Sequence, residues 1–166
     1  INNSGTIKSG NGSVVLAAGQ KVLLSDADPN QVVFEVQAPE SSALNLGNVE
    51  AGKSVGIFAN SLTHSGAIKA VDMVAGEGGK VVLTGASVTL AAGSSIDVSA
   101  PNKGGTVLVG GDYQGKNPQV RNAQTTTMEA DATINADAAL KGDGGKVILW
   151  WRPPPSSSFA HSAPAG

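Results

Sequence analysis

The sequence contains no cysteine, few aromatic residues and no long apolar run. Without cysteine the chain cannot hold a disulfide framework, a thiolate metal site or a cysteine nucleophile. No apolar segment reaches the length of a membrane-spanning helix. The 11 basic and 13 acidic residues are scattered singly, so no basic patch indicates a nucleic-acid partner. The chain begins at Ile1 with neither an initiator methionine nor a signal peptide, and we expect it to be a fragment or a processed piece.

The scarcity of aromatic residues also restricts the core. With 3 Phe, 2 Trp and 1 Tyr among 166 residues, the interior must be built from valine, isoleucine, leucine and alanine. The 22 glycines accompany many β-branched residues. This mixture favours short strands joined by tight turns and therefore an all-β fold.

One pattern recurs along the chain: an isoleucine in a short strand, a variable loop, then glycine and a short apolar strand. The copies lie at 5–16, 66–83, 95–109 and 133–149, with a weaker copy at 43–57. A further strand follows some copies, as KVLL at 21–24 and SVTL at 87–90. Three short strands per repeat predict a β-solenoid. We expect about five coils, beginning near Thr6, Ala43, Ala67, Ser95 and Thr133.

Alternation within the strands agrees with this prediction. Ile7, Ile68, Ile96 and Ile134 occupy equivalent positions and are each followed by a polar residue: Lys8, Lys69, Asp97 and Asn135. A period of two places one face inside and one outside. In the second strand of each repeat, two residues should then point inward: Val14 and Leu16, Val81 and Leu83, Val107 and Val109, Val147 and Leu149. Stacked coils bury these apolar faces against their neighbours.

Two segments interrupt the coils. Residues 25–42 contain an extra strand, VVFEV, between turn clusters, and residues 110–127 form a polar loop. Insertions of this kind project from one side of a solenoid without breaking the stack. Because loops on a rigid scaffold usually carry recognition, we expect these two to make the contacts with a receptor.

The stretch LGNVEAGKSVG at 46–56 raises the question of nucleotide binding, because it fits G-x-x-x-x-G-K-[ST] with Lys53 as the lysine. A phosphate-binding loop lies between a buried strand and a helix, whose N-terminus helps to hold the anion. The residues that follow here, VGIFANSL, favour a strand and a turn instead. Lys53 also has counterparts in Lys80 and Lys146, each placed before an apolar strand. The context favours a solenoid turn and leaves a P-loop nucleotide-binding domain as a less favoured alternative.

Few other side chains indicate chemistry. His64 and His161 are too isolated for a metal site, and we expect His64 to be a solvated residue in a turn. Asp97 should stack with Lys69 and Asn135 on the outer face as an ordinary surface pair. The remaining acidic candidates fall in loops of different lengths: Asp72, Glu77, Asp137 and Asp143.

A solenoid enzyme that acts on polysaccharides needs several carboxylates or basic groups converging on one face. The sequence shows no such convergence, so we predict no catalytic residue, no metal site and no cofactor. A polysaccharide-binding or polysaccharide-modifying β-helix protein is kept as the alternative function.

The second strand carries a further feature. Its middle residues, Val15, Val82, Leu108 and Ile148, are apolar although alternation turns them outward. Strands that are apolar on both sides are usually covered on both faces. We expect either the VVFEV insertion or a partner surface to cover this stripe, and self-association through it is one prediction.

The repeats resemble those of filamentous-haemagglutinin-like exoproteins of bacterial two-partner secretion systems. The matching phrases are INNSGTIKSGNGSVVLAAGQKVLL at 1–24, HSGAIKA at 64–70, GGKVVLTGASVTLAAGSSIDVSA at 78–100, GGTVLVGGDYQG at 104–115 and GDGGKVILW at 142–150. The resemblance covers residues 1–150. It implies a right-handed parallel β-helix, export through an outer-membrane partner transporter, and display at the bacterial cell surface as an adhesin.

Two departures accompany the resemblance. The N-P-N-G-like signatures of the family's N-terminal secretion domain are absent, so we expect this piece to lie in the repeat region just downstream of that domain. Residues 151–166 run as WRPPPSSSFAHSAPAG, which cannot form an interior strand. We interpret them as a Pro/Ser/Ala-rich tail, disordered or translated out of frame.

The predicted function is therefore structural and adhesive: a segment of a large secreted adhesin that contributes to cell adhesion and virulence. Host-cell or surface glycans and proteins are the expected receptors. The isolated segment should also associate through its open solenoid edges.

Overall fold

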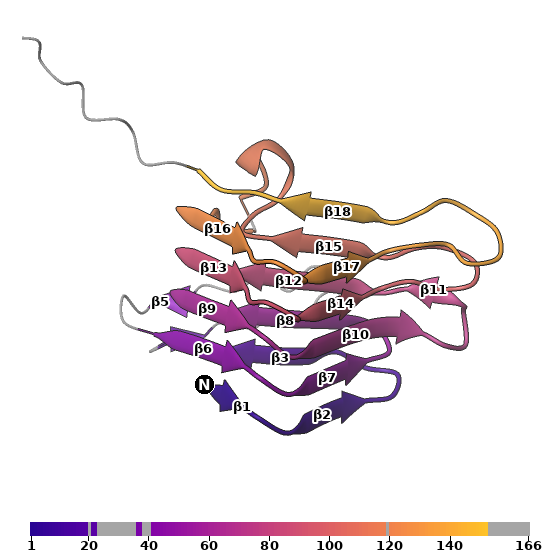
Figure 1. Ribbon diagram of the computed structural model, residues 1–166, viewed down its shortest axis with the longest axis horizontal. Helices are drawn as coiled ribbons and strands as arrows, with labels where there is room; N and C mark the ends of the chain where they lie inside the picture. The colour runs from indigo at the N-terminus through magenta and orange to yellow at the C-terminus, as the bar shows by residue number, and fades with distance from the viewer. Residues whose placement is uncertain (20, 23–35, 38–40, 119, 153–166) are drawn as a thin grey trace, which may run out of the picture.

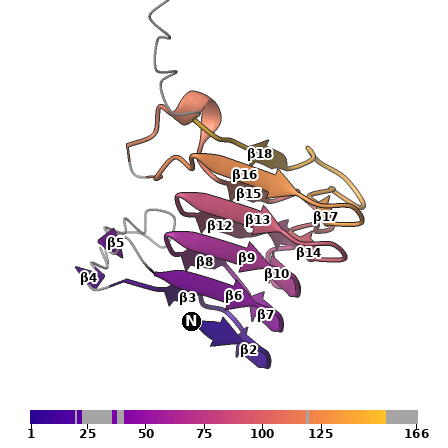
Figure 2. The same ribbon diagram turned by 60° about the vertical axis from the view of Figure 1, so that its left-hand side comes forward.

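The structure is a computed structural model, and it describes residues 1–19, 21–22, 36–37, 41–118 and 120–152. Three sheets of parallel strands form the walls of a parallel β-helix, as the sequence predicts. Figure 1 shows the coils stacked from the N-terminal strands at the bottom to β18 at the top, and Figure 2 shows the same stack turned by 60°.

Each sheet receives one strand from every coil. The first sheet contains β1 (Asn2–Asn3), β6 (Ser42–Asn45), β9 (Ser61–His64), β13 (Ser87–Leu90) and β16 (Thr125–Met128). The second contains β2 (Thr6–Ser9), β7 (Asn48–Ala51), β10 (Ala67–Asp72), β14 (Ser95–Asp97) and β17 (Thr133–Asn135). The third contains β3 (Val14–Ala17), β8 (Ser54–Phe58), β12 (Lys80–Thr84), β15 (Thr106–Val109) and β18 (Lys146–Leu149). One coil therefore runs from the first sheet through the second to the third.

The isoleucines that mark the repeats stack directly on one another. Ile68 pairs with Ile96 and Ile96 with Ile134, while Val49 stands between Ile7 and Ile68. The predicted column is confirmed, but the predicted start of the second coil at Ala43 is wrong. Ala43 lies in the first sheet opposite Leu62, and the strand equivalent to β2 begins at Asn48.

The core is a narrow interior filled by small aliphatic side chains. Ile68, Leu83 and Val107 are at most 1% exposed, because the coils above and below cover them. Val147 and Leu149 face the same interior from the last described coil, yet they remain 42% and 37% exposed. Their position in the last described coil explains the difference, since one coil cannot bury its own apolar face.

Two segments depart from the predicted layout. Lys21–Val22 (β4) is not part of the three stacked sheets, because it pairs antiparallel with β5 (Val36–Gln37). The first two residues of KVLL thus lie outside the three stacked sheets. Leu23 and Leu24, like the residues of VVFEV before Val36, lie outside the described residues. The second insertion is shorter than expected. Thr125–Met128 forms β16, since TTTM pairs in register with SVTL of β13.

The tail hypothesis concerns a part of the chain that the structure does not describe. Trp150 follows β18, and its backbone N–H donates to the carbonyl oxygen of Val109 at 2.8 Å. Residues 153–166 lie outside the described residues, so the tail stays a prediction from the sequence.

Candidate functional site

Lys53 lies in a turn of the solenoid. The next residues, Ser54–Phe58, form β8 in the third sheet, which confirms the solenoid interpretation and leaves no helix N-terminus to hold a phosphate. The predicted equivalence with Lys80 is wrong by one residue, because Lys80 pairs with Ser54. Gly79 is the true counterpart of Lys53, and a side chain at Gly79 would collide with the Lys53 carbonyl oxygen.

A cleft opens beside this turn, where the second sheet passes into the third. Its volume is about 380 Å³. Residues from three successive coils line it, mostly glycines and charged residues: Gly52, Lys53, Asp72, Glu77, Gly78, Gly79, Lys80, Lys103, Gly104, Gly105 and Thr106. Glycine is required at Gly78 and Gly105, because the backbones approach so closely that a Cβ at either position would collide with a neighbouring coil.

A hairpin forms one wall of the cleft. β11 (Glu77–Gly78) folds back on β10 with Asp72 opposite Glu77, and Figure 1 shows it projecting from the edge of the stack. The Asp72 carboxylate accepts the backbone N–H groups of Val74 and Ala75 at 2.9 Å, which closes the turn. Asn102 from the next coil donates its side-chain N–H to the Ala75 carbonyl oxygen at 3.0 Å. The hairpin is therefore fixed both from within and by its neighbour.

The cleft presents charged side chains over a backbone that is already hydrogen-bonded. The N–H groups of Gly79, Lys80 and Thr106 all donate to carbonyl oxygens of the protein. The charged groups that line the cleft are the side chains of three lysines and two carboxylates. Such a surface can hold acidic groups on the lysines and hydroxyl groups on the carboxylates.

Sequence reasoning missed this convergence. It noted only that Asp72 and Glu77, like the other acidic candidates, fall in loops of different lengths, whereas the hairpin sets these two opposite each other beside Lys53. The signal was the segment AVDMVAGEGGKV, in which a short strand, a turn and a second strand precede the next apolar strand. Asp137 and Asp143 do not line this cleft.

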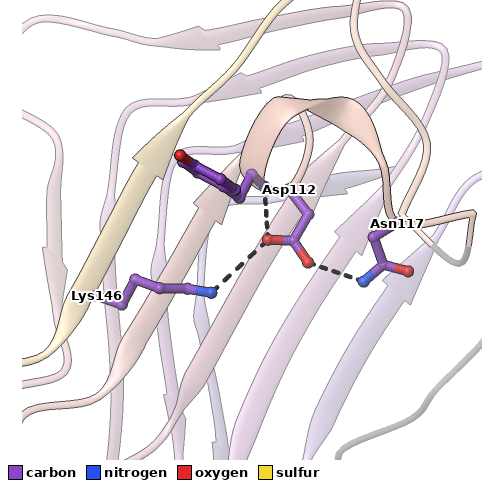
Figure 3. A network of polar contacts seen from close by, with 4 residues as sticks. Asp112, Asn117 and Lys146 are labelled. Carbon is purple, nitrogen blue, oxygen red and sulfur yellow. Dashed lines mark hydrogen bonds and ion pairs between the residues drawn. The ribbon is translucent and has the colours of Figure 1, made fainter.

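The loop between β15 and β16 folds back over its own sheet. Asp112 Oδ1 accepts the Tyr113 N–H at 2.7 Å, capping the 3-10 turn η1 (Tyr113–Gly115), and Oδ2 accepts from Asn117 at 2.8 Å. Lys146 Nζ lies 3.8 Å from Asp112 Oδ1, as Figure 3 shows. Burial alone would raise the pKa of Asp112, but these hydrogen bonds together with nearby lysines outweigh it and lower that pKa.

The loop also contains polar atoms that lack partners within the described residues. Asn122 donates to the Gly115 carbonyl oxygen at 2.9 Å, but its Oδ1 is buried without a hydrogen bond, as is Trp150 Nε1. A Cβ at Gly115 would lie within 3.0 Å of both atoms, so they flank the same glycine. An acceptor and a donor thus face one small region at the base of the loop.

The apolar stripe on the outside of the third sheet is only partly as predicted. Gly56 lies between Val15 and Val82, and the Phe58 ring occupies the space beside that glycine. Exposure also varies, from 36% for Val15 to 2% for Leu108. Asp112 follows β15 closely, and its carboxylate lies beside Lys146, the first residue of the neighbouring strand β18. We therefore expect the loop that begins at Asp112 to cover Leu108.

The expectation for His64 is wrong. His64 is the last residue of β9, is 0% exposed and points into the core, where it hydrogen-bonds to Asn45 and to the Ser95 carbonyl oxygen. The sequence placed it in a solvated turn because histidine is polar and a Ser-Gly pair follows. His161 lies outside the described residues.

The outer face of the second sheet holds the predicted polar column. Lys8 and Glu50 form an ion pair of 2.8 Å between exposed side chains. Asp97 stands beside Lys69 and Asn135 in register, but its carboxylate accepts hydrogen bonds from Ser99. Surface ion pairs of this kind contribute little to stability.

No group of three or more potential metal ligands occurs in the part of the chain that the structure describes. Within the same residues, no helix has the length and apolar character that crossing a membrane requires.

Comparison with known proteins gives one structural relative. The chain matches no protein-family model and no curated protein. It is similar to the crystal structure of the HMW1 secretion domain from Haemophilus influenzae, with 26% sequence identity and a TM-score of 0.60. The match covers 88% of this chain and 54% of that structure, so the chain spans about half the length of the relative. This likeness to a secretion domain supports the relationship to secreted exoproteins that the sequence motifs indicate.

Proposed function

We propose that this chain is a solenoid segment of a large bacterial adhesin that is secreted by a two-partner system and displayed at the cell surface. The observation that carries the proposal is the match of 88% of the chain to a secretion domain at 26% identity. Its contribution is mechanical: stacked coils form a stiff rod that holds recognition loops away from the cell. The loop around Asp112 is the described candidate for contact with a glycan or protein receptor, and no catalytic step is assigned to it.

Within such a protein, we place the chain in the haemagglutinin-like repeat region that follows the secretion domain. Its sequence lacks the N-P-N-G-like signatures of that domain. Export distinguishes the two positions. The chain should leave the cell through the outer-membrane partner transporter only when an authentic secretion domain precedes it. Export behind a signal peptide alone would place it within the secretion domain itself, and failure of both fusions would contradict the proposal.

The last described coil also supports self-association. Met128, Val147 and Leu149 are 37% to 42% exposed there, beside strands that have no further partner on that side among the described residues. Unpaired strand edges with apolar neighbours favour the addition of further strands. Light scattering should show assembly that increases with concentration. A strictly monomeric chain at millimolar concentration would exclude this contact.

The charged cleft supports polysaccharide binding as a second function. Lys53, Lys80 and Lys103 line the cleft together with the carboxylates of Asp72 and Glu77. This combination suits a saccharide that carries carboxylate and hydroxyl groups. Titration with an acidic oligosaccharide should shift NMR signals of Gly78 and Gly104, whereas a neutral oligosaccharide of equal length should shift them less. Replacing the three lysines by alanine should abolish the shifts.

A matched control uses three lysines outside the cleft, Lys8, Lys116 and Lys141. Their replacement by alanine changes the net charge equally and should leave binding intact. Equal loss of binding in both triple variants would show that the attraction is a general charge effect. Release of shorter products from the oligosaccharide would contradict the assignment of the chain as a non-enzyme.

A further inference from the structure

A line of polar side chains crosses the interior of the β-helix. Asn3, Asn45 and His64 occupy one column of the first sheet, and Asn45 and His64 are 1% and 0% exposed. Asn3 Nδ2 lies 2.7 Å from Asn45 Oδ1, and Asn45 Nδ2 lies 3.1 Å from His64 Nδ1. His64 Nε2 lies 3.1 Å from the carbonyl oxygen of Ser95. The line thus links four coils, and we call it the Asn3–Asn45–His64 relay.

The two ends of the relay fix the direction of every hydrogen bond within it. At one end the backbone N–H of Gly5 donates to Asn3 Oδ1 at 3.2 Å, and a peptide N–H can only donate. At the other end the Ser95 carbonyl oxygen can only accept. Each amide must therefore accept on one side and donate on the other. His64 consequently accepts at Nδ1 and donates from Nε2, which makes it a neutral imidazole.

A second proton on His64 disrupts this arrangement. It can bind only at Nδ1, where the Asn45 amide already directs an N–H. The Asn45 carbonyl oxygen also lies near the ring, but it already accepts the N–H groups of Ser65 and Gly66. If the Asn45 side-chain amide turned so that its oxygen could accept the new proton, its NH₂ group would face the NH₂ group of Asn3, and neither could accept. Turning Asn3 as well would break its bond with Gly5.

Among the residues that the structure describes, the surroundings of His64 supply no charge that could stabilise a protonated ring. On the elements that pack around it, Asp97 faces outward and binds Ser99, while Glu129 accepts the Ala92 N–H. The Ile1 ammonium donates to the Ser42 carbonyl oxygen. Lys69 lies on the outer side of β10, and the Asp72 carboxylate accepts the N–H groups of Val74 and Ala75. Burial lowers the pKa of His64 by more than the carbonyl oxygens of Ser95 and Asn45 raise it.

The N-terminal coil is the part of the relay that can yield. β1 contains two residues, whereas β6 and β9, the other strands of the relay, contain four each. The carbonyl oxygens of Ile1, just before β1, and of Asn3 accept the N–H groups of Leu44 and Leu46, which ties β1 to β6 and the following turn. Beyond His64 the same column continues with Leu90 and Met128, which are apolar. Loss of the relay therefore affects the N-terminal coils and leaves the column above His64 unchanged.

We propose that the Asn3–Asn45–His64 relay is an acid-sensitive latch: protonation of His64 breaks the relay and releases β1 from β6. The direction of the pH dependence follows from the burial of the neutral imidazole. The folded chain binds the proton less readily than the unfolded chain, so the latch is fully closed above the unfolded pKa of about 6.5 and opens as the pH falls below it. The opening constant should rise by up to about tenfold for each pH unit below that value.

Two measurements on the wild-type chain test the latch. Long-range ¹H–¹⁵N NMR at pH 8 should show His64 Nδ1 unprotonated and Nε2 protonated. Amide hydrogen exchange, corrected for the intrinsic effect of pH, should show Leu44 and Leu46 losing protection between pH 7 and 5, while Val81 and Val107 in the third sheet keep theirs. A proton on Nδ1 at pH 8, or equal loss of protection at all four amides, would overturn the proposal.

A variant separates titration from packing. In His64→Gln the side-chain oxygen can accept from Asn45 and the amide nitrogen can donate to Ser95, but the group takes up no proton in this range. Protection of Leu44 and Leu46 should then no longer depend on pH between 7 and 5. If His64→Gln fails to fold, the wild-type tautomer and exchange data still decide. Unchanged pH dependence in a folded His64→Gln chain would count against His64 as the trigger.

Discussion

Gly79 packs so closely against the Lys53 carbonyl oxygen that no Cβ atom could be placed between them. The N–H of Lys80 donates to that same oxygen at 2.9 Å. Gly52, the glycine before Lys53 in the motif that resembles a phosphate-binding loop, is constrained in the same way, because a Cβ there would collide with the Gly10 carbonyl oxygen. This glycine therefore reflects the close stacking of coil backbones.

Replacing Gly79 by alanine should lower the free energy of unfolding by about 1–3 kcal/mol, because a rigid backbone neighbour must move. Denaturation in urea gives the change from the shift of the midpoint at constant slope. Gly144→Ala is the control, since nothing lies within 4 Å of a Cβ at that position. Equal destabilisation by both changes would show that loss of glycine, rather than collision, is responsible.

Leu108 should contribute more to stability than any other member of the outer stripe. Leu108→Ala should cost about 2–4 kcal/mol, because a 2% exposed side chain leaves a cavity. Val15→Ala in the same column should cost under about 1 kcal/mol, since Val15 is already 36% exposed. Thermal or urea unfolding measures both changes. Similar costs at the two positions would mean that the loop does not cover Leu108.

Asn45 should be sensitive to single replacement but tolerant of a paired one. Asn45→Leu leaves His64 Nδ1 buried without its donor and should cost about 1–3 kcal/mol. Adding His64→Leu removes the unpaired group and makes the column resemble Leu90 in the next coil, so stability should be partly restored. The double-mutant cycle at pH 8 measures the coupling. Strictly additive losses would indicate that the two side chains act independently.

Asp112 should make the loop between β15 and β16 sensitive to acid. Its pKa is lowered in the folded chain, so the stabilisation is present above the unfolded pKa of about 3.9 and is lost as the pH falls through the folded value. Near-ultraviolet circular dichroism of Tyr113 and Trp150 should report loosening of the loop in this range. Asp112→Asn should remove the transition, whereas Asp143→Asn, in a loop of the last described coil, should retain it.

The repeats in the sequence were sufficient to predict the stacked columns. Ile68, Ile96 and Ile134 are recognisable because each is followed by a polar and then a small or apolar residue, and the structure places them in register. The same reasoning failed where the local pattern was weak. The phase of the second coil was set from Ala43, because SALN and NVEA are two short strands that alternate in the same way.

The cleft and the relay could not have been predicted in this way. Asp72 meets Lys53 and Lys103 only because three coils turn at the same corner, although the residues come from different repeats. His64 and Asn45 end strands that look polar at that point, and their burial depends on facing each other inside the helix. Two isolated polar residues give no local signal of such a pairing.

The sequence by itself determined the architecture: alternation with a period of two, repeated in small aliphatic residues, leaves stacking as the way to bury one face of every strand. Only the tertiary structure decided which residues of different coils meet, because insertions of unequal length separate the strands along the chain. Local periodicity specifies the side to which a residue points. The neighbour it finds there depends on the register between coils, which backbone hydrogen bonds and the close glycine contacts fix together.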